Sequence, residues 1–402
     1  MLVLCSDPMG PRRGASPGAC VGHRGQSAEV RPCTAFPEEG LDYAFTDPPP
    51  VPGARQHGRG AGGTRVSSTA DEEFMRIALA AAVLGPAADP NPQVGAAITD
   101  ASGHLVAVGH HRGSGTPHAE IGALIQAGTR ARGGTLYVTL EPCRHRGRTG
   151  PCTEALIGAG ISRVVFAQED PTEQAGGGSQ VLAEAGIAVE SGVLAEEATA
   201  LNAFWSWAMY LGRPVVSWKY AATLDGRSAA VDGTSQWITG EEARADVHER
   251  RSQCGAIVVG TGTALTDDPQ LTVRDSYGAL TGRQPYRVVV GHRDLPDGAH
   301  LRDGSAPTLF LHTHDPAEVL AELHEREIRH VWLEGGPTLA GAFLEAGLVD
   351  EVVAYIAPML LGAGPSALFG PQITTLAEAY RLQLQDVARL GDDIRLILNP
   401  VD

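Results

Sequence analysis

The stretch TPHAEIGALIQAG, residues 116–128, predicts a helix with an unusual start. Ile121, Leu124 and Ile125 recur at the three-and-four spacing of one apolar face, and Gly128 follows as a stop signal. This spacing favours an amphipathic helix packed on one side against a core. His118 and Glu120, two positions apart, precede the apolar face. The helix pattern does not explain this pair, so other segments of the chain have to be considered.

His118 and Glu120 have two interpretations. They can be a capping histidine and a first-turn glutamate that interacts favourably with the helix dipole. They can also be part of a metal site, because TLYVTLEPCRHRGRTGPCTEALI, residues 135–157, supplies Cys143 and Cys152 after a predicted strand. One histidine and two cysteines hold zinc by three protein ligands and leave the fourth position open for water.

The order H-x-E, then P-C and a second cysteine, is typical of zinc deaminases, in which the glutamate is a proton carrier and not a ligand. Zinc lowers the pKa of its water toward neutrality and so generates the nucleophile. A helix that starts at Cys152 would help to keep its thiol ionised. We therefore expect His118, Cys143 and Cys152 to be the metal ligands and Glu120 to be the catalytic residue.

Eight residues separate the two cysteines, whereas the general deaminase pattern has two. PHAE followed by TLEPCRHRGRTGPC closely resembles the deaminase domain of the bifunctional deaminase–reductases of riboflavin biosynthesis. The segments DPNPQVGAAI (89–98) and GHHRGSGTPHAE (109–120) resemble substrate-binding segments of the same family. The resemblance implies a cytidine-deaminase-like α/β/α sandwich in this part of the chain.

Composition restricts the partners. The chain has 402 residues, 31 Lys and Arg against 47 Asp and Glu, and a formal net charge of −16. This balance disfavours nucleic acid, because phosphate binding needs a basic face. No apolar run approaches the roughly 18 residues of a membrane span, and no basic region precedes the short apolar run at the start. We expect a cytoplasmic protein with reduced thiols and with no nucleic-acid or membrane partner. The family resemblance implies a small phosphorylated pyrimidine as the substrate.

The chain divides by pattern into four parts. Residues 1–68 lack apolar periodicity, which predicts a disordered N-terminal extension. Residues 69–194 alternate helix and strand patterns, as in an α/β sandwich. Residues 195–213 predict one connecting helix, and residues 214–402 predict a second α/β domain.

The second domain contains KYAATLDGRSA, SQWITG, VGTGTALTDDPQLTVR and LEGGPTLAGAFLEAGLVDE. In the last of these, a strand ends at Glu334, Gly335 and Gly336 permit close backbone approach, and a helix from about Thr338 offers N–H groups to a phosphate. The pattern is not G-x-G-x-x-G, so it does not predict a Rossmann domain. All four segments resemble the reductase domain of the same family, which is similar to dihydrofolate reductase and is expected to use NADPH.

The resemblance implies two consecutive reactions. The first is zinc-dependent hydrolytic deamination of 2,5-diamino-6-ribosylamino-4(3H)-pyrimidinone 5′-phosphate, and the second is NADPH-dependent reduction of the ribosyl side chain to give 5-amino-6-ribitylamino-uracil 5′-phosphate. Matching positions imply NADPH contacts by Ala221, Trp237, Thr263, Asp267, Gly336, Pro337, Thr338, Leu339, Ala340, Gly341 and Ala342. They imply substrate contacts by Ser235, Arg251, Leu271, Arg274 and Glu334.

Three questions stay open at the level of sequence. The first is which polar group near the expected reduction centre donates a proton, among Lys219, Asp225 and Asp267. The second is whether the basic loop after the first cysteine is solvated or contacts the substrate phosphate, to which arginine is suited; the loop contains Arg144, His145, Arg146 and Arg148. The third is the oligomeric state, for which we expect a homo-oligomer, a dimer or a tetramer.

The chain departs from the family pattern at two places. Thr172 and Glu173 stand where Asn-Pro is usual in the family. Gly291 and His292 stand where Asp-Ser is common, at a position that contacts the cofactor in the family. His292 and the adjacent Arg293 can bind the 2′-phosphate of NADPH or can point to solvent.

Two rival functions are less favoured. A protein that binds pyrimidines or dinucleotides without chemistry is disfavoured by the intact zinc-site residues, and a zinc assay tests it. A deaminase of bases in nucleic acid is disfavoured by the acidic balance and by the reductase half, and a gel-shift with tRNA tests it.

Overall fold

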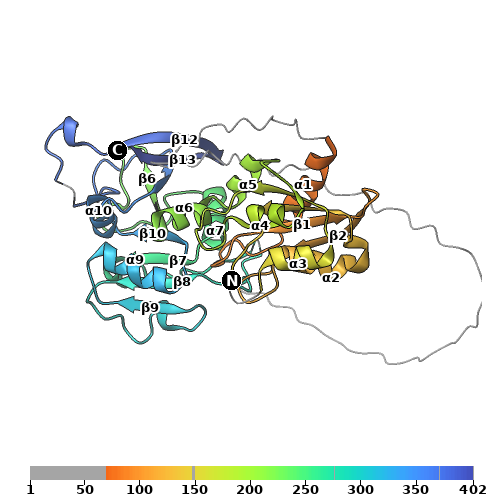
Figure 1. The fold of residues 1–402 in the computed structure, drawn as a ribbon. Coiled ribbons are helices and arrows are strands. Elements are labelled where there is room, and N and C mark those ends of the chain that lie inside the picture. The colour runs from red at the N-terminus through yellow and green to blue at the C-terminus, as the bar shows by residue number, and fades with distance from the viewer. Residues whose placement is uncertain (1–68, 147–149, 276, 371, 402) are drawn as a thin grey trace, which may run out of the picture. The chain divides into compact units, whose positions relative to one another are not determined.

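A computed structural model describes residues 69–146, 150–275, 277–370 and 372–401. The predicted disorder of residues 1–68 and the side chain of Arg148 lie outside these ranges. The described residues form two β-sheets, each with helices on both faces (Figure 1). Both halves are therefore α/β structures, as the sequence predicts.

The first sheet has five strands in the order β2-β1-β3-β4-β5. β1 runs antiparallel to β2 and β3, whereas β3, β4 and β5 are parallel. The bounds are β1 Gly95–Thr99, β2 Leu105–His110, β3 Thr135–Leu140, β4 Arg163–Gln168 and β5 Ala188–Ser191. β3 and β4 are buried along nearly their whole length, as expected for parallel strands covered on both faces.

Helices cover this sheet in two layers. On β3, Leu136 and Val138 pack with α2, α3 and α4, whereas Tyr137 packs with α1 and α5 on the opposite face. The alternation follows from the two-residue period of a strand. The bounds are α1 Thr69–Ala82, α2 Ala119–Ala127, η1 Gly128–Ala131, α3 Cys152–Ala159, α4 Gly178–Glu184 and α5 Ala195–Leu201.

The buried face of α2 differs from the predicted one. Ala119 and Ala123 are fully buried, whereas Ile125 is 74% exposed. The reason is the short distance between the helix and β2. A Cβ atom at Gly109 would lie 2.4 Å from the Ala119 carbonyl oxygen and 2.7 Å from the Ala123 nitrogen, so no large side chain fits between the two elements.

The connecting helix is broken, which corrects the prediction of one helix over residues 195–213. α5 ends at Leu201, and α6 spans Ala203–Leu211. The buried Asn202 between them uses its side chain elsewhere. Its Oδ1 accepts a hydrogen bond from the Gln93 backbone nitrogen at 2.8 Å, and its Nδ2 donates to the Gln93 carbonyl at 2.9 Å.

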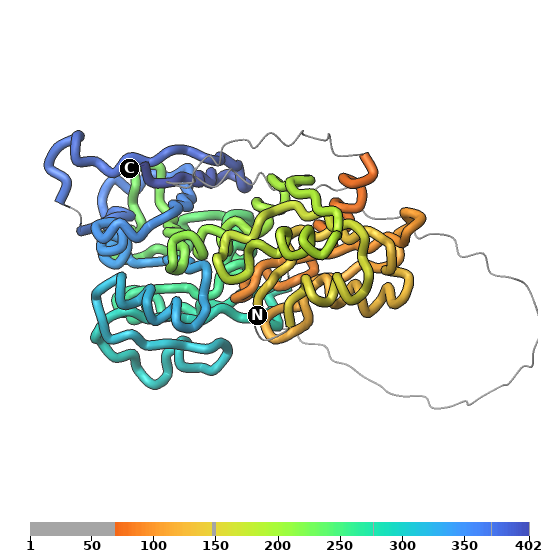
Figure 2. The backbone as a smooth tube through the Cα atoms, viewed as in Figure 1, coloured from red at the N-terminus to blue at the C-terminus, as the bar shows by residue number. Residues whose placement is uncertain are grey.

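The second sheet has eight strands in the order β12-β13-β11-β6-β10-β7-β8-β9. The strands from β6 to β11 run parallel to one another, whereas β13 pairs antiparallel with β11 and with β12. The hairpin of β12 and β13, in dark blue in Figure 2, thus extends one edge of the sheet. The bounds are β6 Val215–Thr223, β7 Ala256–Gly260, β8 Tyr286–Val290, β9 Thr308–Leu311, β10 His330–Gly335, β11 Glu351–Ala357, β12 Arg381–Leu390 and β13 Asp393–Val401.

This sheet is also covered on both faces. On β10, Val331 and Leu333 pack with α9 and α10, whereas Trp332 packs with α7 and α8. The bounds are α7 Glu241–Ser252, α8 Thr261–Asp267, η2 His300–Arg302, α9 Pro316–Glu325, α10 Pro337–Glu345 and η3 Leu376–Glu378. In the described part of the chain, no helix has the length and apolar character needed to cross a membrane.

The contact between α2 and β2 gives a matched pair of predictions. Gly109→Ala should destabilise the protein by about 1–3 kcal/mol, because the added methyl group meets helix backbone that cannot rotate away. Gly122→Ala, within α2 and with open space around its Cβ position, should stabilise by up to about 1 kcal/mol. Thermal unfolding of both variants measures this, and equal effects would contradict the close contact.

Candidate metal centre and reductase cavity

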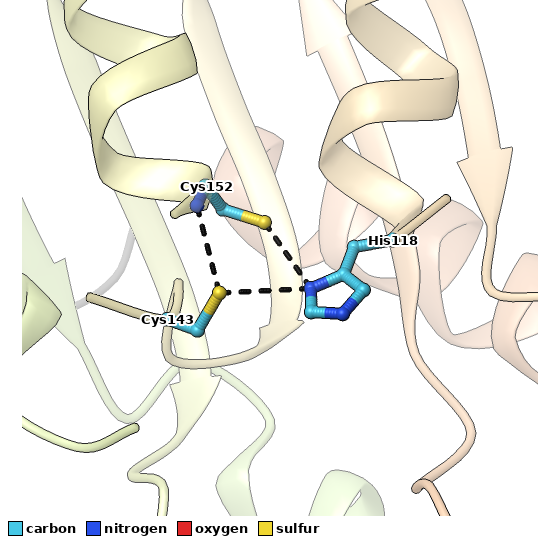
Figure 3. Close-up of side chains that lie close together, drawn as sticks. All are labelled: His118, Cys143 and Cys152. Atoms are coloured by element: carbon cyan, nitrogen blue, oxygen red, sulfur yellow. Dashed lines mark hydrogen bonds between the residues drawn. The ribbon is translucent and has the colours of Figure 1, made fainter. Parts of the chain in front are cut away.

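Three elements contribute one side chain each to a compact cluster (Figure 3). His118 precedes α2, Cys143 follows β3, and Cys152 is the first residue of α3. The Nδ1 atom of His118 lies 3.6 Å from the Cys143 sulfur and 3.3 Å from the Cys152 sulfur. The three ligand atoms lie within 4.8 Å of one another. A donor set of one imidazole and two thiols fits zinc.

The side chain of His118 makes no capping hydrogen bond, although the residue stands at the N-cap position of α2. Its ring instead lies beside the two sulfur atoms (Figure 3). The capping interpretation of this histidine is therefore wrong.

The two thiols ionise unequally. Hydrogen bonds from Cys152 and His118 lower the pKa of Cys143, against the cost of burial. The same contact with Cys143, together with burial, raises the pKa of Cys152. A cation at the site would stabilise the ionised form of both thiols.

Glu120 lies in the first turn of α2 and is 3% exposed. Burial raises the pKa of its carboxyl group, and nearby His118 opposes that shift. Its oxygen atoms do not belong to the three-ligand cluster. A buried carboxyl group with a raised pKa, beside a metal-ligand set, is suited to take up and release protons.

The loop that follows β4 keeps a defined structure despite its unusual sequence. Asp170 accepts hydrogen bonds from both the nitrogen and the hydroxyl of Thr172, at 2.8 and 2.6 Å. Glu141, just before the ligand loop, accepts from the backbone nitrogen of Ser179 at 2.9 Å. A Cβ atom at Gly178 would lie 1.8 Å from the Pro142 carbonyl oxygen, so a glycine is required there.

His111 lies beside the metal centre, and Asn91 contacts His111. The sequence analysis singled out the segments 89–98 and 109–120 that contain them, but not these two residues. The ring of His111 lies edge-on to that of His118, with centroids 5.5 Å apart. Its Nδ1 is 3.1 Å from the Pro117 carbonyl, and its Nε2 is 3.1 Å from the Asn91 amide nitrogen. No spacing rule links Asn91 to His111, so their contact was not predictable from the sequence.

The second domain contains a cavity of about 1770 Å³. All five expected substrate residues line it, namely Ser235, Arg251, Leu271, Arg274 and Glu334. Nine of the expected cofactor residues line it as well: Ala221, Trp237, Thr263, Asp267, Gly336, Pro337, Thr338, Leu339 and Ala342. Ala340 and Gly341 do not, because both are buried within α10.

Arg251 and Glu334 form an ion pair at the cavity wall. Arg251 donates from Nε and Nη2 to the two Glu334 oxygens, at 2.5 and 2.7 Å. Burial alone would raise the pKa of Glu334, but Arg251 and Lys219 hold it at about 2. Lys219 also lines the cavity, and burial lowers its pKa.

Asp225 does not line the cavity, unlike Lys219 and Asp267. Its carboxylate accepts hydrogen bonds from the backbone nitrogens of Leu361 and Gly362, at 3.2 and 2.6 Å. These contacts hold the loop at Leu361 and Gly362 against Asp225.

The cavity fits a phosphate-bearing dinucleotide such as NADPH. The backbone nitrogen of Gly336 is 2.9 Å from the Thr263 hydroxyl, and a Cβ atom there would lie equally close to that oxygen. Gly336, the residue just before α10 begins at Pro337, therefore has no side chain to block a ligand. A glycine just before the start of a helix lets a phosphate come close to the backbone there.

A zinc-ligand set in one half of the chain and a dinucleotide-sized cavity in the other are the combination expected of a bifunctional deaminase–reductase. Residues 68–168 match the cytidine and deoxycytidylate deaminase zinc-binding region, and residues 214–396 match the RibD C-terminal domain. RibD of Mycobacterium tuberculosis, named a riboflavin biosynthesis protein, is 48% identical over 311 residues, which are 77% of this chain and 91% of that protein.

Solved structures agree with this class. RibD of Acinetobacter baumannii has a TM-score of 0.75 at 40% identity and covers 83% of this chain and 99% of its own. A Thermotoga maritima diaminohydroxyphosphoribosylaminopyrimidine deaminase/5-amino-6-(5-phosphoribosylamino)uracil reductase has a TM-score of 0.74 at 33% identity, with the same coverage. The chain belongs to the RibD family of riboflavin biosynthesis proteins, and it contains both the deaminase and the reductase domain.

The ligand set predicts the metal content. The purified wild-type chain should hold about one zinc, and Cys143→Ser or Cys152→Ser should lose most of it, because each removes one of three protein ligands. Cys254→Ser is the control, since Cys254 is buried against His330, away from the cluster, at 3.3 Å from its Nδ1. Full zinc in either ligand variant, or loss in the control, would contradict the assignment.

Proposed function

We propose that the chain catalyses two consecutive steps of riboflavin biosynthesis on a phosphorylated pyrimidine. The first removes the 2-amino group of 2,5-diamino-6-ribosylamino-4(3H)-pyrimidinone 5′-phosphate as ammonia. The second reduces the ribosyl side chain of the product to a ribityl chain with NADPH. The observation that carries the proposal is the cluster of His118, Cys143 and Cys152 beside the buried Glu120, in one chain with the reductase cavity.

The deaminase step requires proton transfer at two atoms. When zinc is bound by His118, Cys143 and Cys152, it supplies Lewis-acid activation of the attacking water. The carboxylate of Glu120 accepts a proton as the water oxygen bonds to C2 of the pyrimidine, and then delivers it to the departing nitrogen. Water adds and ammonia leaves, so no oxidant or reductant is needed. Burial of Glu120 favours this role, because it raises the pKa of the carboxyl group.

The basic loop is a proposed contact for the substrate phosphate. Arg144 donates to the Glu173 carbonyl at 3.0 Å, and Arg146 pairs with the exposed Glu154 at 3.1 Å. The Nδ1 atom of His145 is buried without a hydrogen-bond partner among the described residues. These arginine contacts hold the loop in place while leaving donor groups for an anion.

The reductase step requires positioning more than a strong acid. We propose that Ser235, Arg251 and Arg274 hold the phosphorylated substrate, with Leu271 and Glu334 beside it. Support comes from their shared position in the cavity wall. When NADPH is bound, it supplies the reducing equivalents. The Arg251–Glu334 pair fixes both side chains, so the wall is ordered before substrate enters.

We also propose the division into a deaminase domain over residues 69–194, a connector over 195–213 and a reductase domain over 214–402, with a cytoplasmic location. The connector is two helices and not one. The N-terminal extension, residues 1–68, is proposed to take no part in either reaction.

We propose that the chain forms a homo-oligomer through the C-terminal hairpin. Leu384 and Val387 on the edge strand β12 are 53% and 54% exposed, and Ile394 on β13 is 44% exposed. An edge strand with exposed apolar side chains is a typical site of association with another chain. A dimer is the simplest assembly that covers such a surface.

Replacement of Glu120 tests the deaminase role. Glu120→Gln keeps the size of the side chain but cannot carry a proton, so deamination should fall by at least about 10²-fold. Zinc content and reduction of the deaminated intermediate should stay near wild type, because the glutamine leaves the ligands and the reductase cavity unchanged. Deamination within about tenfold of wild type would rule out the proton-carrier role.

Sedimentation velocity tests the association surface. The double substitution Leu384→Lys and Val387→Lys should shift the wild-type oligomer to a smaller species, because it places charge on the edge strand. Ile125→Lys is the control, since Ile125 is equally apolar and 74% exposed on α2. A monomeric wild type, or an unchanged double variant, would contradict this proposal.

A further inference from the structure

A group of basic side chains lies where two parallel strands end. Arg293 follows β8 and His314 follows β9, and these strands are neighbours in the sheet. Both side chains line the reductase cavity. His292 does not line it, but its ring packs edge-on against that of His314, with centroids 4.7 Å apart. The two carboxyl ends thus present one guanidinium and one imidazole to the same space.

Glycines bring these groups close to the segment after β7. Gly291 has a φ of 130°, and a Cβ atom there would lie 2.7 Å from the Thr261 hydroxyl oxygen. A Cβ atom at Gly262 would lie 3.1 Å from Nη2 of Arg293. The unusual Gly291 is therefore a packing requirement, and it lets the Arg293 guanidinium lie over Gly262.

The basic groups are available for a ligand. In the ranges that the structure describes, Arg293 has no ion-pair partner, and both Arg293 and His314 are exposed. Two acids that follow His314 in the sequence lie outside the cavity lining and form hydrogen bonds of their own. Asp315 caps α9 by accepting from the Ala317 nitrogen at 2.9 Å, and Glu318 accepts from the Thr313 hydroxyl.

We propose that Arg293 and His314 bind the 2′-phosphate of NADPH, and that His292 positions the His314 ring. The inference rests on the proposed reductase function. The same cavity includes Gly336 and Thr338 at the start of α10, where the pyrophosphate shared by both cofactors would lie. A guanidinium and an imidazole are the donors that distinguish a phosphate from the hydroxyl group of NADH.

The proposed donors are therefore not the adjacent residues His292 and Arg293 at the end of one strand. The second donor comes from the neighbouring strand β9, 21 positions after Arg293 in the chain. His292 acts through His314, since its own side chain lies outside the cavity lining.

Calorimetric titration of the full-length chain tests the proposal with two pairs of probes. NADP⁺ against NAD⁺, and 2′,5′-ADP against 5′-AMP, differ only by the 2′-phosphate. Arg293→Ala should weaken binding of NADP⁺ and 2′,5′-ADP about tenfold or more, because a charged hydrogen-bond donor is lost. Binding of NAD⁺ and 5′-AMP should change less than about twofold. His314→Gln should show the same selective loss at a smaller size.

Two controls separate a structural effect from a lost contact. His312→Gln replaces an exposed histidine two residues earlier on the same strand end, outside the cavity lining, and should leave all four affinities unchanged. His292→Ala should weaken NADP⁺ selectively but less than His314→Gln. Melting temperature and zinc content should stay at wild-type values in every variant.

The outcomes are distinguishable. A wild type that prefers NADP⁺, with both Arg293→Ala and His314→Gln unchanged, would overturn this assignment and leave the reductase function standing. Equal losses for NADP⁺ and NAD⁺ would also overturn it. A wild type that binds neither cofactor would overturn the reductase function and this inference with it.

Discussion

The close contact between α2 and β2 is the constraint on which the metal centre depends. Gly109 has no side chain, so the backbone of Ala119 and Ala123 can lie directly on the strand. This contact fixes the start of the helix, where His118 meets the two thiols and Glu120 is buried beside them. A helix held farther from the sheet would separate the histidine from Cys143 and Cys152, whose positions are set by β3 and α3.

Both halves of the chain place their chemistry where strands end. Cys143 follows β3, Glu334 lies near the end of β10, and Arg293 follows β8. In parallel sheets the carboxyl ends converge on one edge, so side chains distant in sequence share a site. The halves differ in what is bound there. The deaminase centre is small and rich in sulfur, whereas the reductase cavity is large and lined by arginines and glycines.

The residues of the candidate metal site were easier to predict from the sequence than the packing of the helices. The order of His118, Glu120, Cys143 and Cys152, together with the family resemblance of the segments around them, indicated a ligand set from the sequence, and the structure brings the histidine and both cysteines together. The buried face of α2 was predicted wrongly. The large apolar residues were expected to face the core, but the helix backbone lies so close to β2 that only alanines fit there. The break at Asn202 was missed because it depends on hydrogen bonds to Gln93, which is distant in sequence. The cavity contacts of His314 also depend on strand order.

The central claim is that one chain performs deamination and then reduction. The most direct measurement follows ammonia release and NADPH oxidation together, after 2,5-diamino-6-ribosylamino-4(3H)-pyrimidinone 5′-phosphate is added to the purified chain. The account predicts ammonia release with or without NADPH, and oxidation of one NADPH for each ammonia released, after a lag. NADPH oxidation without ammonia release, or ammonia release that never leads to oxidation, would contradict it.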